Sequence, residues 1–414
     1  MSTARAPLRS LDEALAELLG HAQPLGRTQT VSTFEADGRV LALDLVSGLH
    51  VPPQDNSSMD GYAVRRAEVA QALASAAALP VSQRIAAGCA GQPLAPGSVA
   101  RIFTGAPIPQ GADAVVMQED AEPIEGPQPA VRISQAPALG QWIRRAGEDV
   151  TRGAVVLARG ERLTPASMGL AAGIGLDTLV VAQRPRVALF STGDELVMPG
   201  EVAPADMKPG AIYNSNRFFL RAMLLRLGCE VSDLGIVPDT REATLAALRQ
   251  ASLAHDLILT SGGVSVGEED HIKPAVEALG RLHLWQMAIK PGKPFAYGRI
   301  GAAHFAGLPG NPVSSFLTFA LLVRPFLLKL QGATRLAPDT MRLAAHFDWP
   351  RADRRREFLR VRRNAQGGLD LFPNQSSGVL TSVVWGDGVV DNPAGQTIAH
   401  GDQVRFISLA ELLA

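Results

Sequence analysis

The chain has few of the residues on which several protein classes depend. It contains only two cysteines, Cys89 and Cys229, which are too few for a disulfide scaffold or a cysteine zinc site. They indicate a reduced, intracellular compartment, so we expect a cytoplasmic protein. The formal net charge of −1 argues against a nucleic acid or a membrane surface that is held mainly by bulk charge. An anion site would have to come from a local arrangement of residues.

The sequence also lacks recognisable targeting segments and several common catalytic motifs. The N-terminus, MSTARAPLRSLDEALAELL, has neither a continuous apolar core nor a cleavage site, so we do not expect a secretion signal. No run approaches the ~20 apolar residues that span a bilayer. No Walker A loop, Ser-His-Asp spacing or histidine-based metal motif stands out. We therefore expect neither a membrane nor a nucleic-acid partner.

What is present describes a chain that folds into several domains. At 414 residues it is too long for one ordinary core, which predicts roughly two to four domains. Hydrophobic residues make up 46% and charged residues 19%. Glycine and proline together account for about 17%, which is below the roughly 25–30% that indicates disorder, so they are expected in turns and loops.

The pattern along the chain predicts an α/β fold with additional β regions. Ser10 to Glu13 reads as a capping box that opens a short helix through Leu19. Short β-prone pieces separated by Gly and Pro fill the region 28–140, and a helix is expected from Pro165 to Gly175. From Arg186 onward, strands alternate with helices, which implies a mostly parallel sheet covered on both faces.

The expected elements of this α/β part can be placed individually. Asp239 to Glu242 reads as a second capping box, for a helix that ends near Leu253. The segment 336–414 returns to short strands and turns. The strands are expected at 187–190, 231–237, 257–260, 282–285 and 304–307, and the other helices at 216–227, up to 279 and at 312–330.

Polar, glycine-rich segments follow several of these strands. Because parallel strands end at the same edge of a sheet, most of these loops should converge there. That would place Glu195, Asp239 and Asp270 near one another, with Lys290 and Lys293 beside a loop of small residues. The segments are Ser191 to Glu195, Pro238 to Asp239, Ser261 to Asp270, Ile289 to Pro294, and Leu308 to Pro312.

This arrangement suits a phosphate and a divalent cation. Backbone N–H groups of Ser261 to Val264, together with lysine ammonium groups, are suited to hold a phosphate. Carboxylates at the edge are suited to hold Mg²⁺, which prefers oxygen ligands and commonly bridges carboxylates to substrate phosphates. Each part also has a simpler explanation. Gly262-Gly263 reads equally as an ordinary turn, the acids Glu268 to Asp270 as compensation of a helix dipole, and Lys290 to Lys293 as a solvated turn.

Three segments of the N-terminal region have simple structural explanations when each is taken alone. Asp55 to Tyr62 fits an Asx turn, Arg101 to Pro107 a strand that ends in a turn, and Arg144 to Asp149 a solvated corner. Both cysteines are more readily explained as buried small hydrophobic residues than as nucleophiles.

Taken together, the segments resemble the molybdopterin molybdenumtransferases, the family that performs the last step of molybdenum cofactor synthesis. The resemblance runs in order along nearly the whole chain and is loose only in the C-terminal segment. The motifs that carry it are DNSSMDGYA (55–63), RIFTGA (101–106), RAGED (145–149), FSTGDEL (190–196), SGGVSVG (261–267), KPGKP (290–294) and GLPGNPVS (307–314).

The resemblance implies an enzyme that inserts molybdate into adenylylated molybdopterin, with Mg²⁺ as cofactor and with release of AMP. It implies an elongated homodimer of four-part subunits, whose active cleft is shared between the αβ domain of one subunit and the β region of the other. Transient contact with other cofactor-synthesis enzymes and with molybdoenzymes is also implied.

The expected fold is α/β plus β. It has a central three-layer αβα domain, an N-terminal β region with a helical linker part, and a small β-barrel-like module at the C-terminus. The expected domains are a helical linker domain (1–27 with 45–53 and 141–180), a β domain (28–44 with 54–140), the αβα domain (181–331) and the C-terminal module (332–414).

The resemblance also assigns roles to individual residues. Catalytic roles fall to Asp60, Thr104, Asp149, Glu195, Asp239 and Asp270, of which Glu195, Asp239 and Asp270 are the expected metal ligands. Substrate-binding roles fall to Ser261, Gly262, Gly263, Ser265, Lys290, Lys293, Pro309, Asn311, Pro312, Arg360 and Ser377.

One departure and two alternatives go with the resemblance. Gln286 stands where some family members have a lysine, which removes one positive charge from the expected anion site. The adenylyltransferase of the preceding step shares a single αβ domain but lacks the N-terminal β region and the C-terminal module. A gephyrin-like scaffold would need a long linker and further domains. The preference for molybdate or tungstate stays open.

Overall fold

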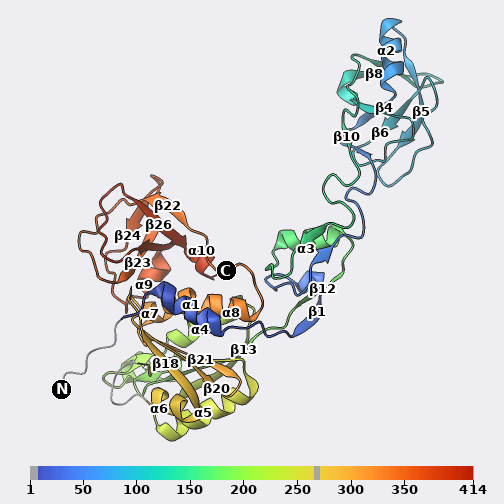
Figure 1. Ribbon diagram of the computed structural model, residues 1–414. Coiled ribbons are helices and arrows are strands. Elements are labelled where there is room, and N and C mark those ends of the chain that lie inside the picture. Colours follow the sequence, from blue (N-terminus) through green and yellow to red (C-terminus); the bar gives the residue numbers. More distant parts are fainter. Residues whose placement is uncertain (1–7, 265–270, 414) are drawn as a thin grey trace.

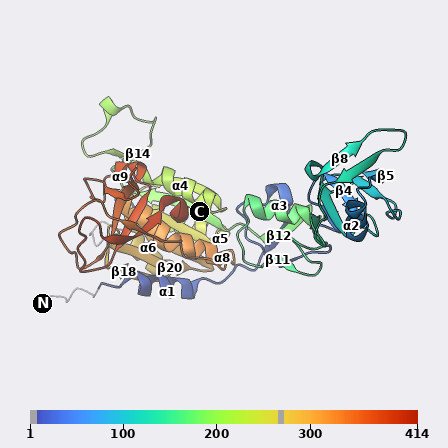
Figure 2. The ribbon, with the colours of Figure 1, turned by 90° about the horizontal axis from the view of Figure 1, so that it is seen from above.

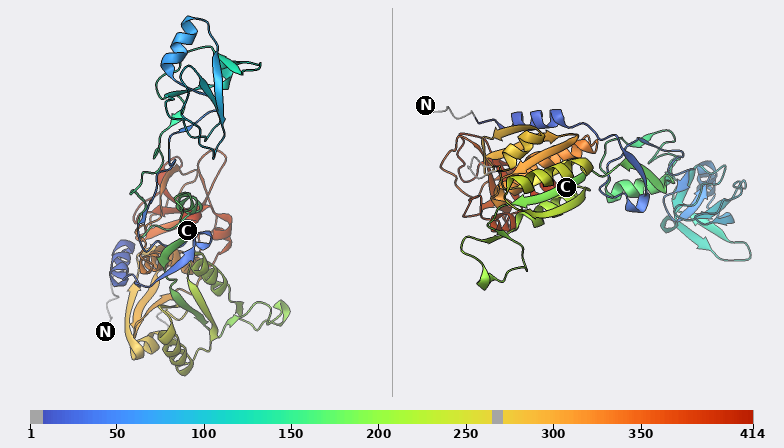
Figure 3. Two further views of the ribbon diagram at one scale, coloured as in Figure 1. Left: turned by 90° about the vertical axis from the view of Figure 1, so that its right-hand side faces the viewer. Right: turned by 90° about the horizontal axis from the view of Figure 1, so that it is seen from below.

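The computed structural model describes residues 8–264 and 271–413, so the predicted site residues Ser265 and Asp270 lie outside the described residues. The chain forms an elongated molecule (Figure 1). One end holds an αβα domain and the C-terminal module, the other end holds a β domain, and a small neck domain lies between them. Figure 3 shows the same order of parts from two further sides.

The αβα domain is built on a six-stranded sheet. Its strand order is β16-β13-β17-β21-β20-β18. The first four strands run parallel, β20 is antiparallel to both of its neighbours, and the sheet is therefore mostly parallel, as the sequence predicts. The strands are β13 (Arg186–Thr192), β16 (Glu230–Val237), β17 (Leu257–Ser261), β18 (Gly280–Gln286), β20 (Pro294–Ile300) and β21 (Ala303–Leu308).

Side chains alternate across this sheet and build two hydrophobic layers. Val187 and Leu189 pack with helix α4 (Asn216–Arg226), and with α1 (Leu11–His21) and the long C-terminal helix of the domain. Ala188 and Phe190 pack on the other face with α5 (Arg241–Ala254) and α6 (Ile272–Leu279). The period of two that separates these pairs produces the predicted three-layer arrangement.

The long helix consists of α7 (Pro312–Thr318), the π-helical turn η4 (Phe319–Val323) and α8 (Arg324–Leu330). Over Pro312–Leu330 this helix is long and apolar enough to span a membrane by length and composition alone. The prediction that no apolar run approaches that length is therefore wrong. Of its most apolar window, 89% is buried inside the protein. A helix that is apolar all round belongs to a large core, and here it fills the first hydrophobic layer.

The two predicted capping boxes have different outcomes. The Ser10 side chain accepts from the Glu13 backbone and the Glu13 side chain accepts from the Ser10 backbone, which confirms the first box. The second is wrong, because α5 is capped by Thr240, whose hydroxyl accepts from the backbone of Ala243. Asp239 therefore lies in the connection between the end of β16 and the helix.

The neck domain contains residues that the sequence assigned elsewhere. Strand β1 (Thr28–Ser32) pairs with β12 (Thr178–Ala182), and β2 (Leu45–Val46) pairs with β11 (Val155–Leu157). Ala36 and Leu41 pack in the same core as Leu45 and Leu163, beside α3 (Pro165–Gly173). Residues 28–44 thus belong to the neck and not to the β domain as expected.

Helix α1 also lies outside its expected domain. It was expected with the linker region, yet Leu11, Ala14 and Leu18 are buried in the first core of the αβα domain. Their spacing forms one apolar stripe on the helix. That stripe is buried against the larger domain, so α1 belongs to it.

The distal β domain is a mixed six-stranded sheet with the order β7-β4-β6-β5-β9-β8. A single helix, α2 (Arg66–Ala74), contributes Val69 and Ala72 to one of its cores. The strands are β4 (Gly61–Val64), β5 (Leu79–Ile85), β6 (Val99–Ile102), β7 (Ala114–Met117), β8 (Ala121–Ile124) and β9 (Ala130–Ile133), and the short pair β3 (Asn56–Ser57) and β10 (Ile143–Arg144) lies beside them.

The C-terminal module is a small closed β structure. Its sheet has the order β19-β23-β25-β26-β22, with β24 paired to β23, and it is closed by a bridge between Ala345, which follows β22, and Leu369 of β24. The αβα domain contributes β19 (Ile289–Lys290) to this sheet. The other elements are β22 (Met341–Ala344), β23 (Arg356–Arg363), β24 (Leu369–Leu371), β25 (Gly388–Asn392), β26 (Gln403–Ser408), α9 (Thr381–Trp385) and α10 (Leu409–Leu413).

Candidate functional site

A cavity of about 540 Å³ opens at the carboxyl ends of β13 and β17. The chain passes from β13 to β16 on one side and then returns to β17 on the other, so the loops diverge here and leave a crevice. Eight predicted site residues line it. They are Glu195, Asp239, Ser261, Gly262, Gly263, Pro309, Asn311 and Pro312.

The glycine loop after β17 has a conformation that other residues do not easily adopt. Gly262 has φ +91° and Gly263 has φ +66°. A Cβ atom on Gly263 would lie 2.6 Å from Cγ1 of Ile272 and 2.9 Å from Oγ1 of Thr192. The N–H of Gly262 donates to the carbonyl of Leu308. This N–H therefore ties the loop to β21, and its predicted role in holding a phosphate is wrong.

Asn216 connects the two loops of the cavity. Its Nδ2 donates to Oγ of Ser261 at 2.8 Å and to the carbonyl of Gly310 at 2.7 Å. Asn216 was not predicted as a site residue, because the sequence pattern indicates only that a helix begins there. The signal was a polar residue at the first position of a helix that follows a glycine-rich segment.

Two further buried polar groups line the cavity without a hydrogen-bond partner among the described residues. They are Oγ of Ser191 and Nδ2 of Asn214, whose residues are 1% and 2% exposed. The Oδ1 of Asn214 accepts from the backbone of Arg217, which fixes the amide orientation. Because buried polar groups are usually hydrogen-bonded, these two suit a ligand in the cavity.

The carboxylates at the cavity are suited to Mg²⁺. Glu195 and Asp239 both line it, whereas the third expected ligand, Asp270, is outside the described residues. Over 8–264 and 271–413, no group of three or more metal-binding side chains comes together. Mg²⁺ is commonly held by one or two carboxylates plus substrate phosphates and water, so two carboxylates beside a loop of small residues fit such an ion.

The two predicted lysines do not line this cavity. Nζ of Lys290 lies 2.9 Å from Oε1 of the buried Glu357 and 3.3 Å from Oδ2 of Asp353. Hydrogen bonds from Arg355, with a further one from Lys290, hold the pKa of Asp353 well below its usual range. Lys290 thus joins the αβα domain to the C-terminal module, and its expected place beside the glycine loop is wrong.

Lys293 does not line the cavity either. Its carbonyl accepts from the backbone of Met287, and the next residue, Pro294, is the one that lines the cavity. The expected place of Lys293 beside the glycine loop is therefore not observed.

Arg360 is a buried cation near the cavity. It is 1% exposed and donates to Oγ of Ser382 and to the carbonyls of Phe358 and Ser376. Among the described residues no carboxylate forms an ion pair with it, and burial lowers its pKa to about 10, so it is protonated at neutral pH. A buried charge without a counter-ion is costly, and an oxyanion would offset that cost.

Ser377 places this part of the C-terminal module at the cavity. Its carbonyl accepts from the backbone N–H of Val313 at 2.9 Å, in the first turn of α7 directly after Pro312. Arg360 donates to the carbonyl of Ser376, and the next residue, Ser377, accepts from Val313. This loop thus connects Arg360 to the residue that follows the lining residue Pro312.

Asp60 and Thr104 form a separate pair in the distal β domain. One oxygen of Asp60 accepts from both the backbone N–H of Thr104 at 2.8 Å and its hydroxyl at 2.9 Å. These hydrogen bonds hold the pKa of Asp60 below its usual range. The distal domain and the αβα domain lie at opposite ends of the molecule (Figure 1). One chain therefore does not bring Asp60 and Glu195 together.

Asp149 is exposed and lies in the connection between the neck and the distal domain. Its backbone N–H donates to the carbonyl of Val51 at 2.9 Å. It is predicted to act with Asp60, yet within the described part of the chain no hydrogen bond joins the two residues.

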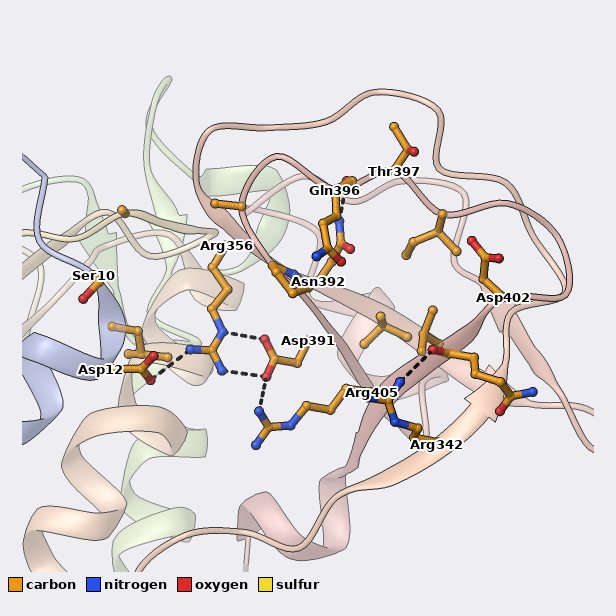
Figure 4. A pocket seen from close by; sticks show the side chains of 18 residues that line it. Ser10, Asp12, Arg342, Arg356, Asp391, Asn392, Gln396, Thr397, Asp402 and Arg405 are labelled. Atoms are coloured by element: carbon orange, nitrogen blue, oxygen red, sulfur yellow. Dashed lines mark hydrogen bonds and ion pairs between the residues drawn. The ribbon is translucent and has the colours of Figure 1, made fainter.

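A larger cavity, of about 810 Å³, lies between α1 and the C-terminal module (Figure 4). Arg356 donates to both oxygens of Asp391 at 2.5 Å and 2.6 Å, and also to Asp12 of α1. Arg405 pairs with the same Asp391. The cations Arg356 and Arg405 are thus paired with the carboxylates of Asp391 and Asp12. The contact of Arg356 with Asp12 holds α1 against the module. None of the predicted site residues that the structure describes lines this cavity.

Comparison with known protein families gives three matches that together cover most of the chain. Residues 9–175 match the MoeA N-terminal region (domain I and II), residues 188–329 match a probable molybdopterin binding domain, and residues 342–409 match the MoeA C-terminal region (domain IV).

Two curated relatives and one solved structure show the extent of the similarity. A molybdopterin molybdenumtransferase of Haemophilus influenzae is 44% identical over 78% of this chain and 78% of its own length. Molybdopterin molybdenumtransferase 2 of Mycobacterium tuberculosis is 36% identical over 97% of this chain and 100% of its own. The molybdopterin biosynthesis moeA protein of Pyrococcus horikoshii OT3 superposes with a TM-score of 0.84 at 29% identity, covering 97% of this chain and 100% of that one.

Proposed function

The chain belongs to the MoeA family of molybdopterin molybdenumtransferases, and we propose that it inserts molybdate into adenylylated molybdopterin in a Mg²⁺-dependent reaction that releases AMP. The observation that carries this proposal is the cavity at the ends of β13 and β17. There Glu195 and Asp239 line the same cavity as the loop of Gly262 and Gly263.

The chemistry follows from the charges of the reactants. Molybdate and a phosphoanhydride are both anions and repel each other. Mg²⁺ bound by the carboxylates would polarise the anhydride and neutralise charge that develops on the AMP leaving group. Ser261 and the loop of Gly310 are held by Asn216 and orient the phosphate end of the pterin substrate. No protein nucleophile is required.

Arg360 is the residue best suited to the oxyanion. Its charge is buried without a carboxylate partner in the described part of the chain, and the loop of Ser376 and Ser377 lies between it and the cavity. A guanidinium offers a planar set of donors that matches an oxyanion. This supports an oxyanion site between Arg360 and the first turn of α7. Because tungstate has the same charge and the same shape as molybdate, the site is proposed for either oxyanion.

We propose that the active protein is a homodimer in which Asp60, Thr104 and Asp149 of one subunit approach the cavity of the other. The elongated shape supports this, because the distal domain is separated from the αβα domain within one chain (Figure 1). Figure 2 shows that the segment around β14 (Leu196–Val197) and β15 (Ile212–Tyr213) projects from the αβα domain. Leu196, Ile212 and Tyr213 of this segment line the cavity. The two free cysteines are compatible with the cytoplasm, where we place the reaction.

The reaction is tested by AMP release from adenylylated molybdopterin after addition of molybdate. Glu195→Gln and Asp239→Asn should each lower the rate by at least about 100-fold, because each removes a carboxylate from the metal. Glu242→Gln is the matched control, since Glu242 is exposed in the first turn of α5. Circular dichroism checks that the fold is retained. Wild-type rates in both cavity variants would contradict the proposal.

The shared cleft has its own test. Asp60→Ala and Glu195→Ala should each be inactive as separate homodimers. After subunit exchange, a mixed dimer carries both defects in one cleft and none in the other, so AMP release should return. No recovery in a mixture that light scattering shows to contain dimers would contradict a shared cleft.

A further inference from the structure

Two arginines of the distal β domain lie over the same aromatic ring. The Cζ atom of Arg84 is 4.4 Å from the ring centroid of Phe103, and that of Arg101 is 4.8 Å from it. Arg84 in β5 and Arg101 in β6 are direct register partners on neighbouring strands. Like charges directly opposite each other destabilise a sheet, so this pairing has an energetic cost in the isolated domain.

The charges of these arginines are not balanced by ion pairs. Within the described residues, neither side chain has a carboxylate at ion-pair distance. Arg101 donates to the carbonyl of Gly61 at 3.2 Å and to Oε1 of Gln118 at 2.7 Å, both of which are neutral acceptors. Arg84 is exposed. The end of the sheet therefore presents two guanidinium groups and a ring to an incoming ligand.

The cluster adjoins the pair formed by Asp60 and Thr104. Phe103 directly precedes Thr104, and the backbone of Gln118 donates to the carbonyl of Asp60 at 3.1 Å. Two carboxylates are nearby: that of Asp60 itself, and that of Glu119, which accepts from the side chain of Gln118. The surface is thus of mixed charge, with the cations grouped around the ring and the acids at its border.

We propose that Arg84, Arg101 and Phe103 form the subsite for the adenylate end of the substrate, which rests on the function proposed above. The guanidinium groups bind the phosphate. The ring and the guanidinium planes stack against the purine, because both are flat and stacking on such surfaces is common for bases. The subsite holds AMP from the distal domain while the pterin end occupies the cavity of the partner's αβα domain.

The chemistry of the cluster favours a mononucleotide over other anions. Molybdate has no flat apolar part that a phenyl ring can contact. A nucleic acid strand needs a longer track of cations, whereas this surface offers two arginines bordered by acids. A purine mononucleotide combines one phosphate with one aromatic base, which matches one pair of guanidinium groups and one ring.

The test is calorimetric titration of the full-length protein with AMP, adenosine and inorganic phosphate in MgCl₂. Arg84→Gln should weaken AMP binding by about tenfold or more, because a charge-assisted contact is lost. Phe103→Leu should weaken AMP and adenosine but leave inorganic phosphate unchanged. Arg84→Lys should recover part of the AMP affinity. Arg132→Gln is the control, since Arg132 lies on the same domain in an exposed pair with Glu122.

The outcomes separate this inference from the function on which it rests. Unchanged AMP affinity in Arg84→Gln, or no AMP binding by the wild type, overturns the subsite even if molybdate-dependent AMP release is intact. Equal losses for AMP and phosphate in Phe103→Leu overturn the stacking role. If the wild type binds AMP through Arg84 but releases none from adenylylated molybdopterin, the subsite stands and the proposed reaction fails.

Discussion

The side-chain amide of Asn216 lies 2.8 Å from the hydroxyl of Ser261 and bridges it to the carbonyl of Gly310. One residue at the start of α4 thereby fixes the relative position of two loops that come from different strands. Both loops line the same cavity. The geometry of the cavity thus depends on a side chain that none of the family motifs quoted above contains.

Asn216→Ala should therefore reduce both stability and substrate affinity. It leaves a buried hydroxyl and a carbonyl without their donor, at a cost of about 1–3 kcal/mol. Urea unfolding should show this loss, and the KM for adenylylated molybdopterin should rise more than kcat falls. Gln250→Ala, at an exposed position of α5, is the control and should change neither. An unchanged KM in the Asn216 variant would show that the two loops hold their positions without it.

Gly263→Ala should destabilise the αβα domain. The residue has φ +66°, and an added Cβ would be 2.6 Å from Ile272. Backbone strain and overlap together should cost about 1–3 kcal/mol. Gly169→Ala, in helix α3 with open space around it, should instead stabilise by about 0.5–1 kcal/mol. Thermal unfolding of the two variants in parallel measures both signs, and equal melting temperatures would contradict the steric argument.

The sequence predicted the αβα domain because the hydrophobic pattern of its strands and helices agrees with the positions of the glycine-rich loops between them. Buried strands such as β17 alternate with helices, and glycine-rich loops follow the strand ends. It misplaced residues 28–44 because β1 and β12 are far apart in the chain and pair only in the folded neck. Short strands carry no information about which partner they choose.

The candidate site, like the fold, was predicted only in part from the sequence. Glu195 and Asp239 were found because parallel strands bring their ends together. Lys290 was misplaced because its partners, Glu357 and Asp353, lie in another domain. Local motifs cannot show which of two nearby surfaces a long side chain joins.

Thr104→Val should raise the pKa of Asp60 toward its usual value. The hydroxyl bond is lost while the backbone N–H of residue 104 still donates to the carboxylate. The pKa of Asp60 is lower in the folded protein than in the unfolded chain. Its ionised form therefore contributes folding stability that is present above the unfolded pKa and is lost as pH falls through the folded pKa. Carboxyl-carbon NMR titration of Asp60 should therefore show its midpoint at higher pH in the variant.

A matched substitution shows whether this shift is local. Thr178→Val, at an exposed position of β12, should leave the Asp60 midpoint unchanged. If Thr104→Val also leaves it unchanged, the hydroxyl does not contribute to the low pKa.

Arg360→Gln should weaken the response to molybdate. The variant loses a buried charge that has no carboxylate partner in the described residues, and charge-assisted hydrogen bonds contribute about 1.5–3 kcal/mol each. The molybdate concentration for half-maximal AMP release should rise at least about tenfold. Arg354→Gln is the control, because Arg354 is exposed nearby in sequence. A normal molybdate response in the Arg360 variant, with its fold intact, would remove this residue from the oxyanion site.

His304 should make the αβα domain sensitive to acid. It is buried in β21, its Nδ1 lies 2.9 Å from the hydroxyl of Tyr297, and burial, with Arg299 and His21 nearby, lowers its pKa to about 4. The unfolded chain then binds a proton at higher pH than the folded one does. Stability that is present above the ordinary histidine pKa of about 6.5 should thus be lost as pH falls toward about 4.

The loss from this residue should be on the order of 2–3 kcal/mol across that window. His304→Phe keeps a ring in contact with Phe326 and cannot take up a proton, so its unfolding free energy should fall less steeply between pH 6.5 and pH 4. Urea unfolding of the wild type and the variant at several pH values compares the two slopes. Parallel slopes would mean that His304 takes up its proton at the same pH in the folded and the unfolded chain, which contradicts a lowered pKa in the folded protein.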